Sequence, residues 1–221
     1  MAHIVSVQEA QLALPQLALQ RVPDFDKKKW AKYIEDIKKK PDPYTPGRYR
    51  GRGGFVLALD GSPIGMLNET FVQKENEAYP NISRKFAPLP DGFVVFLSSG
   101  NVISIFQIFQ EFCRSRIREL DIHLIGICSN NTEVKVVPEN SHQDGTDRVG
   151  ILVIDRLNIE GGETQVARSK GGKPFFSEIL EPGEMLMFDD RKYWHYVTPI
   201  KSISPEPGWR FVVVLTAKLY S

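Results

Sequence analysis

The sequence of 221 residues has few cysteines, no long apolar run and almost no excess of charge of either sign. Cys113 and Cys128 form neither a CxxC pair nor a zinc-knuckle spacing, and we expect two free, buried thiols rather than a disulfide. No run approaches the roughly 20 apolar residues that a membrane-spanning helix needs. Lys and Arg number 28 against 27 for Asp and Glu, which gives no reason to expect a nucleic-acid or anionic-membrane partner.

The N-terminal segment also lacks the features of a targeting sequence. MAHIVSVQEAQLALPQLALQ has no basic n-region, and Gln and Pro15 interrupt its apolar stretch, so we expect no signal peptide. Together with the two free thiols, this predicts a cytoplasmic protein. The length is that of one well-packed domain over residues 1–221, and no internal repeat is visible.

The first half of the chain contains two segments with helical periodicity. Residues 27–40 (KKKWAKYIEDIKKK) place apolar side chains at helical spacing behind a cap at Asp24 or Asp26, and residues 102–120 do so behind Asn101. Between them, residues 41–54 (PDPYTPGRYRGRGG) contain three prolines and four glycines, which predicts a break in regular structure.

The second half consists of short β-rich runs separated by turn residues. These are DIHLIGICS, EVKVV, VGILVIDRL, TQVARS, EMLMFD, HYVTPI and RFVVVLTAKLY. The expected fold is therefore mainly β with supporting helices, a barrel or double-sheet sandwich of the jelly-roll kind. Residues 1–120 would supply the helical support and the first strands, and residues 121–221 the β core. The double glycine in NIEGGETQV predicts a hairpin turn.

Three residues of the second half have the side chains of a metal site. His142 and Asp144 are two positions apart, so in an extended segment both side chains point to the same side. His195 follows 51 residues after Asp144, and we expect it at the start of a strand antiparallel to EMLMF. Two imidazoles and one carboxylate on one face of an octahedron are typical of non-haem iron(II) oxygenases, because three positions stay open for co-substrate and dioxygen.

A cation for the co-substrate stands at the head of the last apolar run. Arg210 lies 15 residues after His195, and a guanidinium can form a bidentate pair with a carboxylate. The ordered set of His-x-Asp, His and Arg, each beside a β-run, is more specific than any single member. In the competing interpretation, His142 and Asp144 lie in a surface turn, His195 is a histidine packed in the core, and Arg210 is a charge at the rim. His123, in an alternating strand, is expected to be a packed histidine rather than a fourth ligand.

The sequence resembles the 2-oxoglutarate/iron(II)-dependent dioxygenase superfamily over residues 136–217. Within it, HQDG, IDRLNIEGGET and FDDRKYWHYVTPI are similar to the small bacterial branch of L-isoleucine dioxygenase-like amino-acid hydroxylases. The resemblance implies a double-stranded β-helix (jelly-roll, cupin-like) core, with iron(II) bound by His142, Asp144 and His195, and 2-oxoglutarate anchored by Arg210. It also implies consumption of O2 and 2-oxoglutarate, with succinate and CO2 as co-products.

The resemblance also places Glu163, Thr164 and Gln165 near the pocket. Trp194 and Trp209 each adjoin a proposed site residue, and we expect them in the core or the pocket wall, where large aromatic side chains shield a metal centre from water. The expected substrate is a small molecule, a free aliphatic amino acid or close derivative, and the expected reaction is hydroxylation. Desaturation or oxidative cyclisation with the same cofactors, and a non-catalytic cupin-like binding module, are the alternatives. A homodimer is possible.

A free amino acid needs a cation for its carboxylate and an acceptor for its ammonium group. The sequence before the β core offers Arg50 and Arg52 in YRGRGG and Asn68 and Glu69 in LNET. We expect these residues at the mouth of the pocket.

Overall fold

The computed structural model describes residues 16–57, 63–66, 70–72, 83–97, 99, 103–137 and 140–220. Its largest sheet has eight strands, which pair in the order β1-β12-β8-β15-β7-β2-β3, with β6 beside β2. Their bounds, in this order, are Leu17–Arg21, Glu184–Asp189, Arg148–Leu157, Gly208–Leu219, Ile117–Ser129, Arg48–Leu57, Pro63–Met66 and Ala87–Pro88. All pairs are antiparallel except that of β2 with β6, so the sheet is nearly all antiparallel.

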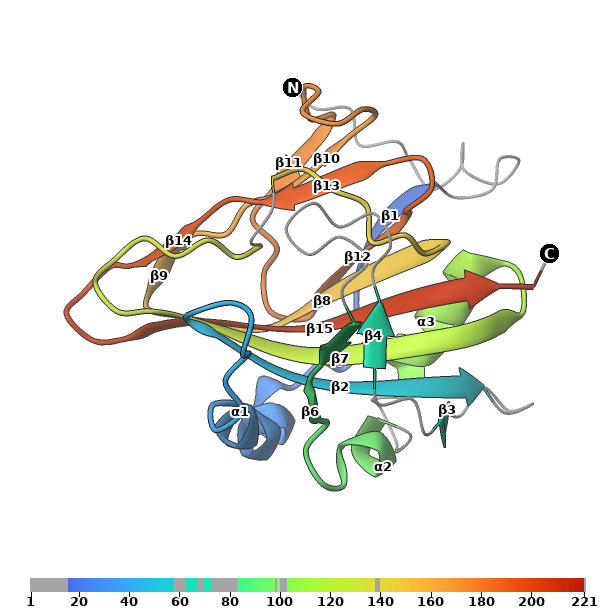
Figure 1. The fold of residues 1–221 in the computed structure, drawn as a ribbon, viewed down its shortest axis with the longest axis horizontal. Helices are drawn as coiled ribbons and strands as arrows, with labels where there is room; N and C mark the ends of the chain where they lie inside the picture. The colour runs from blue at the N-terminus through green and yellow to red at the C-terminus, as the bar shows by residue number, and fades with distance from the viewer. Residues whose placement is uncertain are drawn as a thin grey trace.

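Smaller sheets lie on one side of this large sheet, and short helices lie on the other (Figure 1). The small sheets pair β11, β10 and β13 (Phe176–Glu178, Thr164–Ala167, Trp194–Val197), β14 with β9 (Ile200–Ser202, Ile159–Gly161), and β4 with β5 (Thr70–Val72, Ser83–Lys85). The helices are α1 (Ala31–Ile37) after the 3-10 turn η2 (Lys27–Trp30), α2 (Phe93–Leu97) and α3 (Ile103–Cys113). The predicted mainly β fold with supporting helices is confirmed.

The alternation of side chains along β15 and β7 separates two apolar cores. Phe211, Val213 and Leu215 of β15 pack with the helices, whereas Val212 and Val214 face the small sheets. In β7, Leu124 packs on the helical side and Ile125 on the opposite side. Because successive side chains of a strand point to opposite faces, each of these strands contributes side chains to both cores.

Of the segment expected to break regular structure, residues 41–47 do so, but residues 48–54 belong to β2, so for this half the expectation was wrong. A Cβ on Gly51 would lie 3.1 Å from the backbone oxygen of Pro88 and 3.2 Å from Cδ1 of Ile37. Glycine therefore lets the strand approach α1 and the segment before α2 closely. On the opposite face, Arg48, Arg50 and Arg52 follow each other at every second position, which is the period of a strand.

Both predicted helices exist but are shorter than expected. The first ends at Ile37 rather than at residue 40, and Asp26 is the cap at the start of η2, where it accepts a hydrogen bond from the backbone N–H of Lys28. The second ends at Cys113, and Arg114 takes a positive φ of 48° before β7 begins at Ile117. Its expected cap, Asn101, lies outside the described residues.

The N-terminal segment contributes a strand that the sequence did not reveal. β1 pairs with β12 at the edge of the large sheet. EVKVV, expected to be a strand, contributes only an isolated bridge between Val134 and Ile200. Among the described residues, no helix has the length and apolar character needed to cross a membrane.

Both cysteines are free as predicted, although only Cys113 is fully buried and Cys128 is partly exposed.

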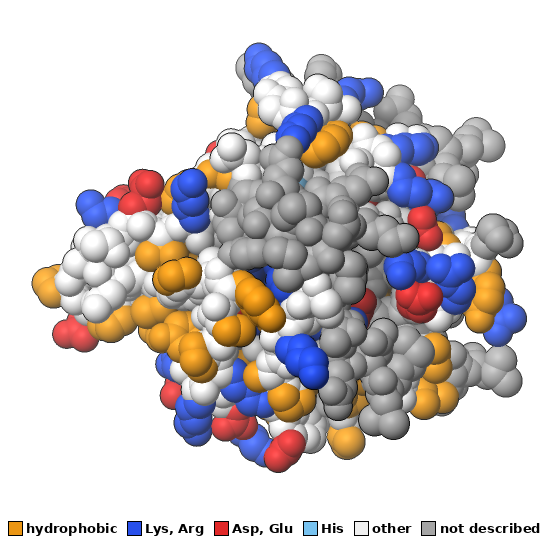
Figure 2. All heavy atoms as spheres, viewed as in Figure 1, with side chains coloured by type: hydrophobic (Ala, Val, Ile, Leu, Met, Phe, Trp, Pro, Cys, Tyr) orange, Lys and Arg blue, Asp and Glu red, His pale blue; other side chains and the backbone are white. Residues whose placement is uncertain are grey.

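On the face drawn in Figure 2, the Lys and Arg side chains of the described residues are interspersed with Asp and Glu.

Candidate metal centre

His142, Asp144 and His195 come together, as the sequence predicted. The backbone N–H of His142 donates to the carbonyl of His195 at 2.9 Å, and the N–H of His195 donates back at 2.8 Å. This pair of hydrogen bonds fastens the loop before β8 to β13. β13 pairs with β10 rather than with EMLMF of β12, so the expected partner strand of His195 was wrong.

The three side chains present their ligand atoms to one point. Nε2 of His142 lies 3.7 Å from Oδ1 of Asp144, and Nε2 of His195 lies 3.7 Å from Oδ2. All three ligand atoms lie within 4.8 Å of one another. The 3.7 Å separations are less than twice a metal–ligand bond of about 2.0–2.2 Å, so one ion can reach each histidine together with the carboxylate.

The protonation states also suit a metal ion. Nδ1 of His142 is 3.1 Å from the carbonyl of Asn140, and this hydrogen bond leaves Nε2 as the electron-pair donor. Burial, followed by the proximity of His142, lowers the pKa of His195 to about 3, so its ring is neutral near pH 7. Burial acts to raise the pKa of Asp144, but His195, His142 and the nearby arginines together give a net lowering of that pKa. Two imidazoles and a carboxylate form a fitting donor set for iron(II).

Asp190 supports this group from behind. Its carboxylate accepts hydrogen bonds from the backbone N–H groups of Asp144 and Thr146, both at 3.0 Å, and its Oδ1 lies 3.8 Å from Nδ1 of His195. Burial and the nearby charge of Asp144 raise the pKa of Asp190 to about 7. No role for Asp190 was predicted from the sequence, and its position five residues before His195 was the available signal.

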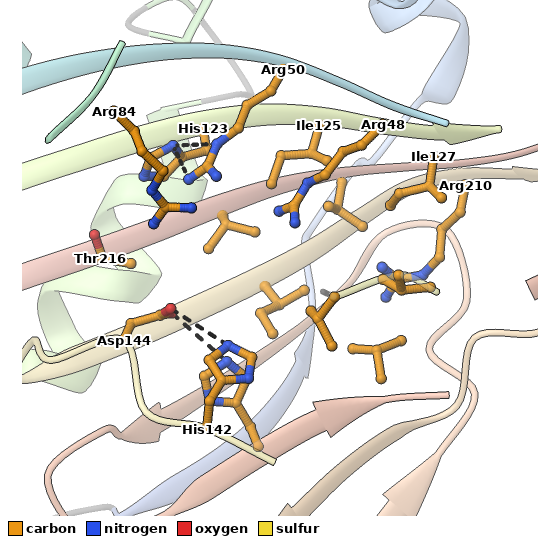
Figure 3. Close-up of a pocket in the computed structure, with 17 residues that line it drawn as sticks. Arg48, Arg50, Arg84, His123, Ile125, Ile127, His142, Asp144, Arg210 and Thr216 are labelled. Atoms are coloured by element: carbon orange, nitrogen blue, oxygen red, sulfur yellow. Dashed lines mark hydrogen bonds and ion pairs between the residues drawn. The ribbon is translucent and has the colours of Figure 1, made fainter. Parts of the chain in front are cut away.

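A cavity opens beside the ligand group and encloses about 780 Å³ of empty space, counted out to its mouth. The large sheet supplies most of its wall, through the side chains of β15, β7 and β2 that point away from the helices. The lining residues are Arg48, Arg50, Arg84, His123, Ile125, Ile127, Val136, Val137, His142, Asp144, Ile151, His195, Val197, Arg210, Val212, Val214 and Thr216. Figure 3 shows the ligand group on one side and arginine side chains on the opposite side.

Arg210 lies at one end of this cavity, on β15 (Figure 3). It is 1% exposed, and its Nε and Nη2 have no hydrogen-bond partner in the described part of the chain. Burial, then the charges of Arg156 and Arg48, lowers its pKa to about 9. A buried guanidinium with unused donors is suited to a carboxylate ligand. Its cross-strand neighbour is Arg156, whose Nη2 donates to the carbonyl of Gly161 at 2.7 Å.

The double glycine forms a corner between two sheets rather than a hairpin turn, so that prediction was wrong. β9 pairs with β14, whereas β10 pairs with β11 and β13. Gly161 and Gly162 have φ values of 76° and 73°, which residues other than glycine rarely adopt. A Cβ on Gly161 would lie 2.1 Å from the carbonyl oxygen of Pro199, and one on Gly162 would lie 3.4 Å from Cδ of Arg210.

The residues expected to contact the substrate are only partly at the cavity. Arg50 lines it, but Arg52 forms an ion pair with Asp121 and is absent from the lining. Gln165 donates to Glu163 at 2.8 Å, and the ring of Trp194 lies 5.6 Å from Nζ of Lys170. Neither lines the cavity, so the cavity gives no reason to assign them to the substrate. The proposed Asn68 and Glu69 lie outside the described residues.

Two lining residues were missed or read differently in the sequence. Arg84 of β5 is 4% exposed, and nothing in the local sequence SRK marks it as a pocket residue. His123 is packed, as expected, and does not belong to the ligand group, but it also faces the cavity. Its Nδ1 accepts hydrogen bonds from Arg50, at 3.1 Å from Nε and 2.9 Å from Nη2.

Comparison with known proteins agrees with this geometry. The model of the family described as 2OG-Fe dioxygenase matches residues 35–216. Among curated protein sequences, none matches the chain.

Several solved structures share the fold. A bsmA homolog from Methylobium petroleophilum PM1 is similar with a TM-score of 0.77 and 20% identity, over 96% of this chain and 91% of that chain. IDO from Bacillus thuringiensis has a TM-score of 0.71 and 18% identity, over 93% and 95% of the two chains. An oxidoreductase of the 2OG-Fe(II) oxygenase family from Burkholderia pseudomallei has a TM-score of 0.54 and 14% identity, over 99% and 92%. These likenesses confirm the predicted double-stranded β-helix core.

Proposed function

The chain belongs to the 2OG-Fe dioxygenase family, and from this premise we propose that it hydroxylates an unactivated carbon of a free aliphatic amino acid or a close derivative. Enzymes of this family are oxidoreductases that use iron(II), 2-oxoglutarate and O2. Family membership decides against a non-catalytic cupin-like module. The amino-acid substrate and the place in the L-isoleucine dioxygenase-like branch are parts of the proposal, supported by the sequence resemblance.

The observation that carries the proposal is the convergence of His142, Asp144 and His195 beside a cavity. We assign these three side chains as the iron ligands. Bound iron(II) would supply the open coordination positions at which 2-oxoglutarate and O2 react. The chain itself holds the ligands in place, through the backbone pairing of the two histidines and the hydrogen bonds that Asp190 accepts.

Arg210 is assigned to the distal carboxylate of 2-oxoglutarate. Its Nε and Nη2 are buried without a partner in the described residues, and both can donate to the two oxygens of one carboxylate. Thr216 faces the cavity from the same strand, and its buried hydroxyl also lacks a partner among the described residues. Polar ligands that enter the cavity can pair with both residues.

The lining between the ligand group and the arginines supports an aliphatic substrate. Eight lining residues are valine or isoleucine, and they exclude water from the carbon that reacts. The eight are Ile125, Ile127, Val136, Val137, Ile151, Val197, Val212 and Val214.

The test is the release of succinate by purified protein with iron(II), 2-oxoglutarate and a panel of free L-amino acids. We expect an aliphatic L-amino acid to stimulate succinate release, and its N-acetyl and methyl-ester forms to fail, because blocking either end leaves a charged group of the site without its partner. The matched control is His195→Ala, which should release no succinate with any compound. Equal turnover of free and blocked forms would contradict a free amino acid. Mass analysis of the product separates hydroxylation from desaturation or cyclisation.

A further inference from the structure

The cavity extends along β15 well beyond the proposed anchor of the co-substrate. Four residues of this strand, spaced two positions apart, line it: Arg210, Val212, Val214 and Thr216. β15 pairs with β7 in one continuous register over this stretch, so the alternation of faces is regular. At about 3.3 Å per residue, the backbones of Arg210 and Thr216 are about 20 Å apart. Figure 3 shows Thr216 at the end of the cavity where Asp144 lies and Arg210 at the other end.

2-Oxoglutarate cannot occupy both ends of the cavity. Its chain of four C–C bonds, each about 1.5 Å long, spans at most about 6 Å. In the proposed function one end of the co-substrate pairs with Arg210 and the other end binds the iron, so neither polar end is left for Thr216. The end of the cavity at Thr216 is therefore available to the substrate.

Thr216 carries a polar atom that the described chain does not use. The residue is 3% exposed, and its Oγ1 has no hydrogen-bond partner among the described residues. Burying a hydroxyl without a partner lowers the stability of a protein, and valine would fill nearly the same space without this cost. A buried hydroxyl that faces a cavity therefore indicates a ligand that pairs with it.

Side-chain acceptors are scarce in the cavity. Among the described lining residues, only Asp144 and Thr216 have a side-chain oxygen, and Asp144 is assigned to the iron together with the two histidines of its ligand group. Arginine has N–H donors and no acceptor. Nδ1 of His123 accepts from Arg50, and burial followed by the nearby arginines keeps the pKa of His123 well below its usual value. The neutral ring then carries its hydrogen on Nε2, which can only donate. Thr216 is thus the side-chain acceptor that this part of the lining offers to a substrate.

We propose that Oγ1 of Thr216 accepts a hydrogen bond from an amino group of the substrate. The inference rests on the proposed function for the reaction and adds the residue that recognises the amino group. It also orients the substrate, whose amino group lies at the end of the cavity away from Arg210. Substrate and 2-oxoglutarate then approach the ligand group from opposite ends.

The test uses pairs of compounds that differ only in the amino group. L-Leucine is compared with 4-methylpentanoate, L-isoleucine with (S)-3-methylpentanoate, and L-leucinamide with 4-methylpentanamide, a pair that has no carboxylate. Binding is measured by anaerobic calorimetry with iron(II) and saturating 2-oxoglutarate, so that the Arg210 site is already occupied. For at least one pair we expect the amino compound to bind about 10-fold or more tightly, which is the effect of one hydrogen bond to a charged group.

Two variants assign this preference to the hydroxyl of Thr216. Thr216→Val should reduce the preference to less than about threefold by weakening the binding of the amino compound alone, and Thr216→Ser, which keeps the hydroxyl, should retain most of it. Thr216→Val should leave the affinity for 2-oxoglutarate unchanged. In the metal-free protein it should raise the midpoint of urea unfolding, because it removes a buried polar atom that has no partner in the described chain.

The matched control is Thr164→Val. Thr164 is also fully buried, and its Oγ1 has no partner in the described part of the chain, but the residue is absent from the cavity lining although the sequence placed it near the pocket. This control should keep the preference for the amino compound. Circular dichroism checks that each variant is folded.

The outcomes separate the inference from the function on which it rests. If only the leucinamide pair shows the preference, the inference stands and the free amino acid is wrong. If an amino acid stimulates succinate release but binds no more tightly than its counterpart without the amino group, the inference is overturned and the proposed reaction stands. Equal weakening of both members by Thr216→Val would show that the hydroxyl contacts another part of the substrate, which also overturns the inference. The same holds if no pair shows the preference, or if Thr216→Val leaves it unchanged.

Discussion

Replacing Arg210 with methionine tests the co-substrate site through two measurements. The affinity for 2-oxoglutarate should fall, whereas the stability of the ligand-free protein should rise. Methionine is unbranched, as is the arginine stem, but it carries no charge and no donors. Truncating one partner of a buried, hydrogen-bonded charge pair costs about 2–5 kcal/mol. At about 1.4 kcal/mol for each factor of ten, the dissociation constant of 2-oxoglutarate should rise about 30-fold to several thousand-fold.

The ligand-free protein should become more stable when Arg210 is replaced. The pKa of Arg210 is lowered to about 9, first by burial and then by Arg156 and Arg48. A cation whose pKa is lower in the folded than in the unfolded state destabilises the fold at pH 7, where it is charged in both states. Arg210→Met removes this penalty, so the free energy of unfolding should rise by about 1–4 kcal/mol.

Urea unfolding of the metal-free protein measures the stability, and anaerobic calorimetry with iron(II) measures the affinity for 2-oxoglutarate. The matched control is Arg168→Met, because the Arg168 guanidinium lies 5.2 Å from the ring centroid of Phe175 and does not line the cavity. It should leave the affinity unchanged. Normal 2-oxoglutarate binding by Arg210→Met would refute the assignment and make Arg156 the next candidate. A loss of affinity together with a large loss of stability would refute the electrostatic argument.

Three further predictions concern the metal site and the corner between the small sheets. His195→Ala should abolish iron(II) binding in a metal titration while the circular dichroism spectrum stays native; near-normal binding would make the third ligand wrong. Asp190→Asn should weaken iron(II) binding about 10–100-fold, because an amide has one acceptor oxygen for the two N–H groups that the carboxylate now holds; an unchanged affinity would contradict this role. Gly161→Ala should lower the free energy of unfolding by about 1–3 kcal/mol or more, because its Cβ would meet the Pro199 carbonyl. Gly171→Ala, at a φ of 64° with nothing within 4 Å, measures the backbone strain alone, and an equal loss in both variants would rule out the contact.

The sequence was sufficient where periodicity and residue type determine the outcome. The β-rich runs at residues 121–129 and 210–220 predicted most of the two longest strands of the described chain, β7 and β15. The sequence failed where local composition and tertiary packing disagree. In β2, Gly51 is required by the close approach of α1 and Pro88, although glycine usually indicates a loop, so the arginines on either side of it were not recognised as one face of a strand.

The sequence by itself determined the kind of chemistry, because the residues for it occur in a fixed order and spacing: His142, Asp144, His195 and Arg210. Only the tertiary structure decided what surrounds them. Arg84 and Arg50 lie on strands that do not pair with each other, yet both line the cavity. Asp190 lies against the loop that carries Asp144 and accepts a hydrogen bond from its backbone N–H. Such contacts depend on how sheets fold over one another. Side chains that are brought together by different sheets have no fixed spacing along the chain, and no periodicity in the sequence records them.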